Sequence, residues 1–300
     1  MTAPTAASTA PREATRRVLV RTSAERRRGA VDRVMRGLAM AAAVACVIPL
    51  AAIIGFVTIN GIGAVNLDLL TKPAKALGVG GGAVAAILGT LQLVAAASVI
   101  AIPLGILAGL YVNEFAGRRS ARWVRFAADV LTGVPSILIG IVAYTLLVLP
   151  FKRYNAFAGS AALAVIMLPV IMRTTEEILR MIPGTLREAG LALGVPTWRV
   201  LVGVVLPTGL AGILTGVMLA VARAAGETAP LLFTALGSRL VNVGDFGSAM
   251  DSLPLFIYTN ARQPYEALNR QAWGAAFLLL VLVLVVNILV RFRTFGRKAG

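Results

Sequence analysis

The chain has 300 residues, of which 58% are hydrophobic and only 14% are charged. In soluble domains about a quarter of the residues are charged, so this composition predicts an integral membrane protein. The formal net charge is +16, which the basic loops on the cytoplasmic side of a membrane protein explain better than nucleic-acid binding does. The sequence has no histidine, which excludes a Ser–His–Asp triad and most histidine metal sites.

Two further absences limit the chemistry of the chain. Cys46 is the single cysteine, so no internal disulfide can form. The glycines at 80–82 do not belong to a Gly-x-x-x-x-Gly-Lys-Ser/Thr motif, so the chain is not expected to hydrolyse ATP. We therefore expect no cofactor on this chain.

Six uncharged runs are long enough to cross a bilayer. They cover residues 37–59, 84–112, 130–151, 154–172, 200–222 and 271–290. They predict an all-α integral membrane protein with six transmembrane helices within residues 37–291. The basic residues 1–36 predict a disordered cytoplasmic tail, which can include a surface helix near the membrane. Residues 292–300 predict a second, short cytoplasmic tail.

The distribution of lysine and arginine predicts the orientation of these helices. With the N-terminus in the cytoplasm, the loops and tails on that side hold 21 basic residues and those on the other side hold 7. Both termini and the segment 183–207 are therefore predicted to be cytoplasmic. Residues 236–270 form the longest outer segment, and its apolar residues and prolines predict a short re-entrant or surface helix.

The segment 183–207 is the most irregular stretch between two apolar runs. We predict a short helix over residues 186–193, which Gly194 ends with a left-handed turn. Because Pro196 cannot continue the same helix, a second helix is expected from Thr197, a candidate N-cap. The segment is thus predicted to form a compact helix–turn–helix that a partner protein could hold.

Charged residues also occur near the predicted spans. Arg223 and Glu227 are four residues apart in the outer half of the fifth span, where a charge costs at least about 2.5–3.5 kcal/mol. They form either a structural ion pair or a pathway site in which Arg223 binds an oxyanion and Glu227 promotes its release. Arg173, after the fourth span, is either an interfacial anchor or a second pathway residue. Glu176 and Glu177 beside it are expected either to be solvated or to stand at the start of the cytoplasmic segment.

Two stretches carry a resemblance to a known family. Glu188-Ala189-Gly190, followed by Gly194 and Leu206-Pro207, resembles the EAA loop of ABC importer permeases, with Gly190 in place of the usual alanine. Residues 168–235 and 131–144 resemble, more narrowly, the PstA family of phosphate importer permeases. This resemblance covers roughly residues 84–291.

The resemblance implies a type I (MetI-like) permease in the cell membrane that imports inorganic phosphate. It implies a homologous second permease (PstC-like), a dimeric ATPase (PstB-like) that holds ATP and Mg²⁺, and an external phosphate-binding protein (PstS-like). It assigns the substrate pathway to Arg223, Glu227, Thr228 and Arg173. The residues it assigns to ATPase coupling are Glu188, Ala189, Gly190, Gly194 and Pro207.

Three alternatives remain open at this stage. The chain could transport another oxyanion, such as sulfate or molybdate, or it could be a secondary transporter or channel that works alone. A transporter working alone has no need of the helix–turn–helix in residues 183–207. A membrane scaffold without transport would leave Arg223 and Glu227 without a purpose.

Overall fold

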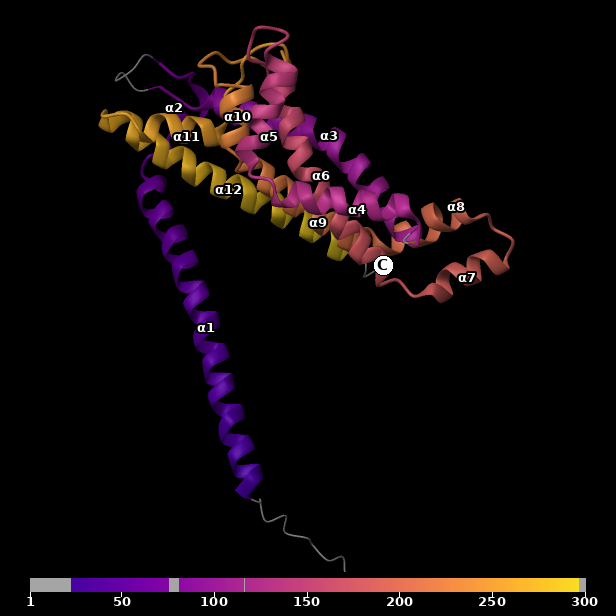
Figure 1. Ribbon diagram of the computed structural model, residues 1–300. Coiled ribbons are helices and arrows are strands. Elements are labelled where there is room, and N and C mark those ends of the chain that lie inside the picture. The colour runs from indigo at the N-terminus through magenta and orange to yellow at the C-terminus, as the bar shows by residue number, and fades with distance from the viewer. Residues whose placement is uncertain (1–22, 76–80, 116, 297–300) are drawn as a thin grey trace, which may run out of the picture. The chain divides into compact units, whose positions relative to one another are not determined.

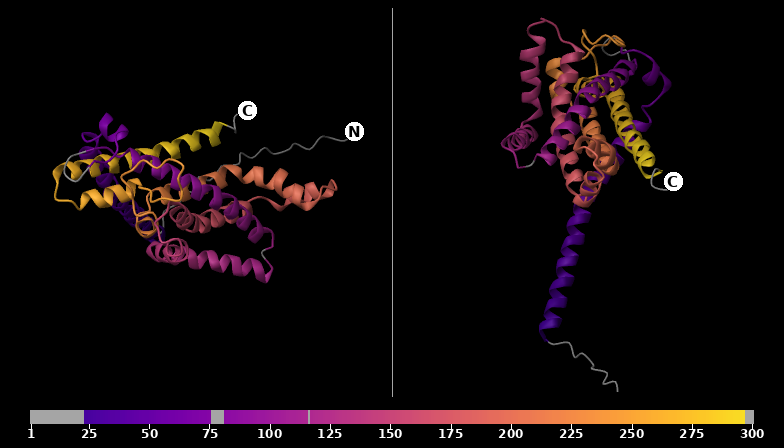
Figure 2. Two further views of the ribbon diagram at one scale, coloured as in Figure 1. Left: turned by 90° about the horizontal axis from the view of Figure 1, so that it is seen from above. Right: turned by 90° about the vertical axis from the view of Figure 1, so that its right-hand side faces the viewer.

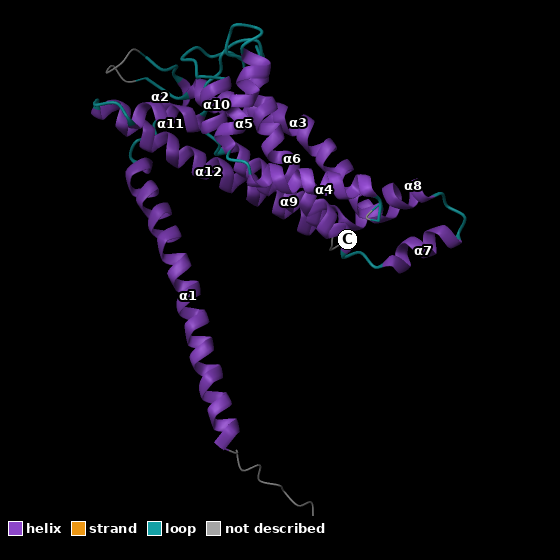
Figure 3. Ribbon diagram, viewed as in Figure 1, coloured by secondary structure: helices purple, strands orange, loops and turns teal. Residues whose placement is uncertain are grey.

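The computed structural model describes residues 23–75, 81–115 and 117–296. Helices dominate this part of the chain, and extended segments pair there only as two isolated β-bridges (Figure 3). The chain divides into two compact units, Met1–Gly55 and Phe56–Gly300.

The first unit contains most of helix α1 (Ser23–Ile62), in which Val31–Ile62 is long and apolar enough to cross a bilayer. The helix begins earlier than the predicted span at residue 37, so residues 23–36, which we predicted to be a disordered tail, are helical. Arg36 and Asp32 support this extension with an i,i+4 ion pair of 3.0 Å. The rest of the predicted tail, residues 1–22, lies outside the described residues.

The second unit is built around four long helices, each long and apolar enough to take part in a membrane span (Figure 1). They are α3 (Val84–Glu114), α6 (Ala156–Arg180), α9 (Leu206–Ala225) and α12 (Glu266–Gly296). The shorter helices are α2 (Leu67–Thr71), α4 (Arg119–Gly133), α5 (Ser136–Ala143), α7 (Gly184–Ala192), α8 (Thr197–Val200), α10 (Ala229–Thr234) and α11 (Leu253–Ala261), with π-helical turns at Tyr144–Val148 and Leu201–Val205. Within the described residues five helices could span a membrane, or six if the bent pair formed by α4 and α5 counts as one span. The predicted all-α membrane fold is confirmed.

The third predicted span, residues 130–151, is not one straight helix. The chain bends by 103° between α4 and the helical segment Ser136–Val148, which begins with α5 (Figure 2). The bend falls at Val134, whose backbone is extended (φ −72°, ψ 129°). The cause is Pro135, because the ring of a proline disfavours the helical conformation of the residue before it.

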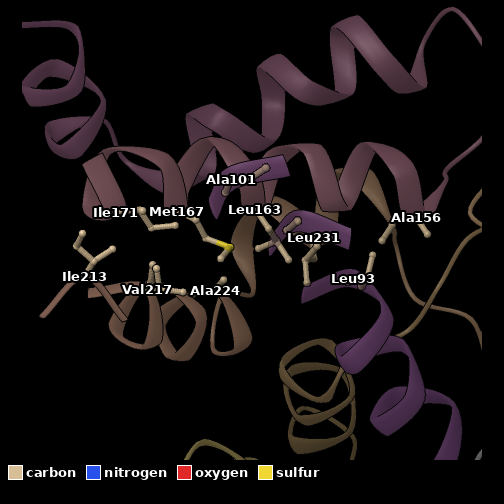
Figure 4. Close-up of a cluster of buried hydrophobic side chains, with 14 of the residues drawn as sticks. Leu93, Ala101, Ala156, Leu163, Met167, Ile171, Ile213, Val217, Ala224 and Leu231 are labelled. Carbon is tan, nitrogen blue, oxygen red and sulfur yellow. The ribbon is translucent and has the colours of Figure 1, made fainter. Parts of the chain in front are cut away.

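The core of the second unit lies where α6 packs between α3 and α9 (Figure 4). Leu163 and Met167 of α6 are fully buried and share this cluster with Val217 of α9. Small residues allow close approach of the helices: a Cβ atom added to Gly109 of α3 would lie 2.7 Å from the carbonyl oxygen of Met172. Small residues at such contacts are typical of helix packing in membranes, where close backbone contact replaces much of the hydrophobic driving force.

The segment 236–270 contains the helix that the sequence predicted, α11. Leu253 and Phe256 of this helix are buried against α3 and α12. Its N-terminus is capped by Ser252, whose hydroxyl accepts a hydrogen bond from the Leu255 N–H at 3.4 Å. Thr90 of α3 accepts a hydrogen bond from the Leu253 N–H at 2.8 Å. Whether α11 enters the bilayer stays a prediction.

Asp251, just before α11, carries a perturbed carboxyl group. Burial raises the pKa of Asp251 to about 7, although the Ser252 N–H, which donates to this carboxylate at 2.8 Å, and the charge of Arg239 both act to lower it. A group whose pKa rises on folding favours the folded state at low pH. The contribution of Asp251 to the stability of the fold is therefore complete below the ordinary pKa of 3.8, and it is lost as the pH rises through about 7.

We expect Asp251→Asn to flatten the pH dependence of stability between about pH 5 and pH 8, because it removes the carboxyl group that must ionise in a buried place. At about pH 8 the variant should be more stable than the parent by at least about 1 kcal/mol. Thermal unfolding in detergent at both pH values measures this. Asp245→Asn is the control: hydrogen bonds from Ser248 and from the Gly247 N–H lower the pKa of Asp245, so this exposed carboxylate stays charged throughout. An unchanged pH profile for Asp251→Asn would contradict the assignment.

Candidate functional site

Arg223 and Glu227 meet at the break between α9 and α10. Helix α9 ends at Ala225, and Gly226 caps it, so the two residues are not on one continuous helix as their spacing suggested. The chain nevertheless continues in a tight turn, in which the Glu227 N–H donates to the Ala224 carbonyl at 3.2 Å. This turn brings Glu227 Oε1 to 3.5 Å from Arg223 Nε. The Arg223 side chain remains 48% exposed, so its other donors are available to a ligand.

The α4–α5 bend lies against Arg223. A narrow crevice of about 10 Å³ is lined by Arg223, by Val134 and Ser136 of the bend, and by Ile166 and Pro169 of α6. A space of this size holds about one water molecule, so Arg223 is closely packed on this side. A movement of the bend would therefore change the surroundings of the guanidinium directly.

Thr228 and Pro230 form the start of α10, directly after Glu227. Thr228 is the N-cap residue, and its carbonyl accepts the Leu232 N–H at 3.1 Å. Pro230 packs against Gly140 of α5, where an added Cβ atom would lie 2.6 Å from the Pro230 Cα. The broken helix is thus fixed on both sides, by α9 before it and by α5 after it.

A second charged group lies on α6, around Glu176. This residue is only 1% exposed, and its carboxylate accepts hydrogen bonds from three arginines. Arg125 of α4 donates through Nε at 2.9 Å and through Nη2 at 2.5 Å. Arg180 donates at 2.7 Å, and Arg173 donates at 3.2 Å. The prediction that Glu176 is solvated was wrong, because these guanidinium groups take the place of water around the carboxylate.

Arg173 also donates to Asp129 of α4. Two ion pairs therefore join helices α4 and α6. In the first, Arg125 of α4 pairs with Glu176 of α6, and in the second, Asp129 of α4 pairs with Arg173 of α6. We call these four residues the α4–α6 clasp. Arg173 lies one helical turn after Pro169, which lines the crevice beside Arg223, so the clasp begins one turn of α6 away from the crevice that Arg223 lines.

Only some of the ion pairs around Glu176 could be predicted from the sequence. Arg173 and Arg180 stand three residues before and four residues after Glu176, which is the spacing of ion pairs on one helix face. The decisive partner, Arg125, is 51 residues away. Its approach depends on how α4 packs, and no local spacing predicts that packing.

The predicted helix–turn–helix is present as α7 and α8, which protrude together from one end of α6 and α9 (Figures 1 and 2). Gly194 has φ +74°, as expected for a glycine that ends a helix in the left-handed region. The second helix begins at Thr197 as predicted, but the N-cap residue is Pro196 and Thr197 is the first helical residue. We call Pro183–Pro207 the finger.

The two helices of the finger pack closely against each other, and several of its side chains are exposed to solvent. A Cβ atom added to Gly190 would lie 2.8 Å from Val200 Cγ2, so the contact between the two helices explains why glycine replaces the usual alanine here. Arg187 ties the finger to the end of α3 through an ion pair of 3.0 Å with Glu114. Glu188 and Ala189 face solvent. The large apolar side chains exposed on α7 and α8 are Leu186, Leu191, Leu193 and Trp198, and such an apolar surface is typical of a protein–protein contact.

Pro207 joins the finger to α9 without ending the helix. A proline lacks the N–H that would bond the carbonyl four residues earlier, which normally kinks a helix. Here the chain forms a π-helical turn over Leu201–Val205, in which the Leu206 N–H bonds the Leu201 carbonyl. The wider turn absorbs the proline. Thr197–Ala225 is consequently one helical element that carries the finger at one end and Arg223 at the other.

Residues 101–293 match the family described as "Binding-protein-dependent transport system inner membrane component". The chain belongs to this family. Among curated relatives, the phosphate transport system permease protein PstA of Pasteurella multocida is 42% identical over 234 residues, which cover 77% of this chain and 83% of the relative. PstA 1 of Mycobacterium tuberculosis is 41% identical over 223 residues, 73% of this chain and 72% of the relative. The resemblance to the PstA family is confirmed, and the chain is a permease subunit rather than an enzyme.

Two solved structures share the fold of this chain. A chain of the MetNI methionine ABC transporter superposes with a TM-score of 0.56 at 20% identity, covering 71% of this chain and 93% of that chain. A chain of a bacterial ABC transporter that imports the acidic polysaccharide alginate gives a TM-score of 0.57 at 16% identity, covering 91% and 99%. These similarities confirm the predicted MetI-like permease fold.

We expect Glu176→Gln to destabilise the folded chain by about 3–5 kcal/mol, the usual cost of removing one partner from a buried ion pair. The amide keeps the shape of the side chain but leaves Arg125, Arg173 and Arg180 without a common counter-charge. Thermal unfolding in detergent measures the effect. The neighbouring Glu177, which is exposed, provides the matched control, and Glu177→Gln should leave the melting temperature unchanged. Equal melting temperatures for the two variants would contradict a stabilising role of the clasp.

Proposed function

We propose that this chain is the permease subunit of an ATP-driven importer of inorganic phosphate and forms one half of the pathway through the membrane. The observation that carries the proposal is the Arg223–Glu227 pair at the break between α9 and α10, in a chain 42% identical to a phosphate permease. An arginine with free donors is suited to a tetrahedral oxyanion.

The chemistry of the pair supports binding followed by release. The guanidinium of Arg223 offers planar, paired N–H donors to two phosphate oxygens. Glu227 is placed 3.5 Å from Nε, and in the proposed cycle the terminal nitrogens bind the substrate. When phosphate departs, the carboxylate restores the neutral pair, so the site does not hold its ligand as tightly as an isolated arginine would. Thr228, the N-cap residue next to Glu227, is proposed to face the same pathway.

Arg173 is proposed as a second pathway residue. Its donors are engaged by Asp129 and Glu176, which supports an alternative role as part of the clasp. In the proposed cycle, phosphate leaving Arg223 passes toward the finger end of α6, where Arg173 exchanges the Asp129 carboxylate for the substrate.

The proposed partners follow from the family. A homologous permease supplies the other half of the pathway, an external binding protein delivers phosphate, and a dimeric ATPase carries ATP and Mg²⁺. The finger, with its exposed Glu188 and apolar side chains, is proposed to lie in the cytoplasm and seat in the ATPase. Because Thr197–Ala225 is one helical element, movement of the finger is transmitted through the turn at Pro207 to Arg223.

Arg223→Gln is expected to reduce phosphate uptake by at least about tenfold, since a hydrogen bond to a charged group contributes about 1.5–3 kcal/mol. Labelled-phosphate uptake into vesicles that contain the assembled transporter measures this, and co-purification of the ATPase confirms assembly. Arg262→Gln, at the exposed end of α11, is the control and should transport normally. Normal uptake by an assembled Arg223→Gln transporter would reduce the pair to a structural role.

Gly194→Val tests the coupling of the finger. A valine in the left-handed region costs about 1–2 kcal/mol or more, so the turn between α7 and α8 is expected to change its angle. ATP hydrolysis should then continue with much less phosphate transported per ATP. Gly184→Val introduces the same side chain into the same finger, where the space is also open and φ is not positive, and should remain coupled. An unchanged ratio of transport to hydrolysis in Gly194→Val would rule out the finger as the coupling element.

A further inference from the structure

Helix α4 has one packed face and one unpartnered face. Ala121 and Ala128 are buried against the neighbouring helices. The opposite face presents one stripe at helical spacing, formed by Arg119, Arg122, Trp123, Phe126 and Val130. Trp123 is 69% exposed and Phe126 is 57% exposed. The stripe is basic at the start of the helix and becomes apolar toward its end.

The arginines of this stripe differ from Arg125 on the same helix and from Arg173 and Arg223. Arg125, Arg173 and Arg223 each face a carboxylate within ion-pair distance. Within the described part of the chain, Arg119 and Arg122 have no such partner, and neither stacks on an aromatic ring. Two neighbouring guanidinium groups on one face therefore lack a counter-charge.

These arginines and the two aromatic rings surround a shallow cavity. Its volume is about 540 Å³, and its lining consists of Arg119, Arg122, Trp123 and Phe126. The two rings contact each other edge to face, with centroids 5.8 Å apart and an interplanar angle of 85°. The cavity thus combines hydrogen-bond donors for an anion at one end with an apolar wall at the other.

The position of α4 in the chain places this cavity at the surface of the bilayer. Helix α3 is long enough to cross the membrane and ends at Glu114, so the membrane surface lies near that residue. Helix α4 begins at Arg119, shortly after this point. Tryptophan at the headgroup level and arginine just outside it are typical of a membrane interface.

We propose that Arg119, Arg122, Trp123 and Phe126 form a binding site for an anionic phospholipid. The two guanidinium groups bind the phosphate of the headgroup, and the aromatic rings contact the glycerol and the first part of the acyl chains. Charge complementarity favours this occupant over a zwitterionic lipid, and the apolar wall favours it over free phosphate. The proposal depends on the membrane-spanning fold and not on the transported substrate.

The test uses the assembled transporter in nanodiscs of phosphatidylcholine with increasing amounts of phosphatidylglycerol. Native mass spectrometry counts the phosphatidylglycerol molecules that stay bound. The double variant Arg119→Gln/Arg122→Gln is expected to weaken retention about thirtyfold, from the contribution of two arginines near an anionic surface. Trp123→Ala should weaken it less. The control, Arg262→Gln/Arg270→Gln, removes two arginines elsewhere on the chain and should retain the lipid as the parent does.

Three outcomes would overturn the proposal. Equal retention of phosphatidylglycerol by the parent and the double variant would show that these arginines do not hold the lipid. Displacement of the lipid by inorganic phosphate alone would assign the cavity to a free anion. A photoreactive residue placed at position 122 that cross-links to the ATPase rather than to lipid would assign the face to an acidic protein surface. Because lipid retention is measured without transport, none of these results depends on the proposed substrate.

Discussion

A single buried carboxylate, that of Glu176, holds two helices of this permease in register. It accepts hydrogen bonds from Arg125 on α4 and from Arg173 and Arg180 on α6. Because the Glu176 carboxylate is buried, it cannot be left unpaired without a large cost, so α4 stays where Arg125 meets this carboxylate. Apolar packing alone would allow α4 to slide, because a membrane offers no hydrophobic gain for one helix contact over another.

The placement of α4 determines the surroundings of the candidate pathway residue. The helix ends at the bend before Pro135, and that bend lines the crevice beside Arg223. From the other direction, the element Thr197–Ala225 connects Arg223 to the finger through the π-helical turn at Pro207. Arg223 is therefore positioned by two independent elements, one held by charges on α6 and one ending in the surface proposed to contact the ATPase. This arrangement is suited to a site whose accessibility changes when the finger moves.

Hydropathy was sufficient to predict the long helices. Uncharged runs located α3, α6 and α9 because a span has to satisfy its backbone within one helix of bilayer length, although α6 continues to Arg180, beyond the predicted end at residue 172. The hydropathy prediction failed at residues 130–151, where the run is uncharged throughout but Pro135 prevents Val134 from being helical. The left-handed Gly194 was predictable from its place before Val195-Pro196, since local backbone sterics decide such a turn.

The sequence by itself determined the membrane class, the long helices, the finger and the spacing of Arg223 and Glu227, because all of these follow from local composition and local sterics. Only the tertiary structure decided that Glu176 is buried, that Arg125 reaches it across 51 residues, and that the α4–α5 bend lies against Arg223. Among the described residues, it also decided that Arg119 and Arg122 remain without a carboxylate partner while Arg125, on the same helix, has one. The physical reason is that an ion pair between helices depends on which faces meet, and the packing of small residues along α3, α6 and α9 sets those faces over distances that no sequence window covers.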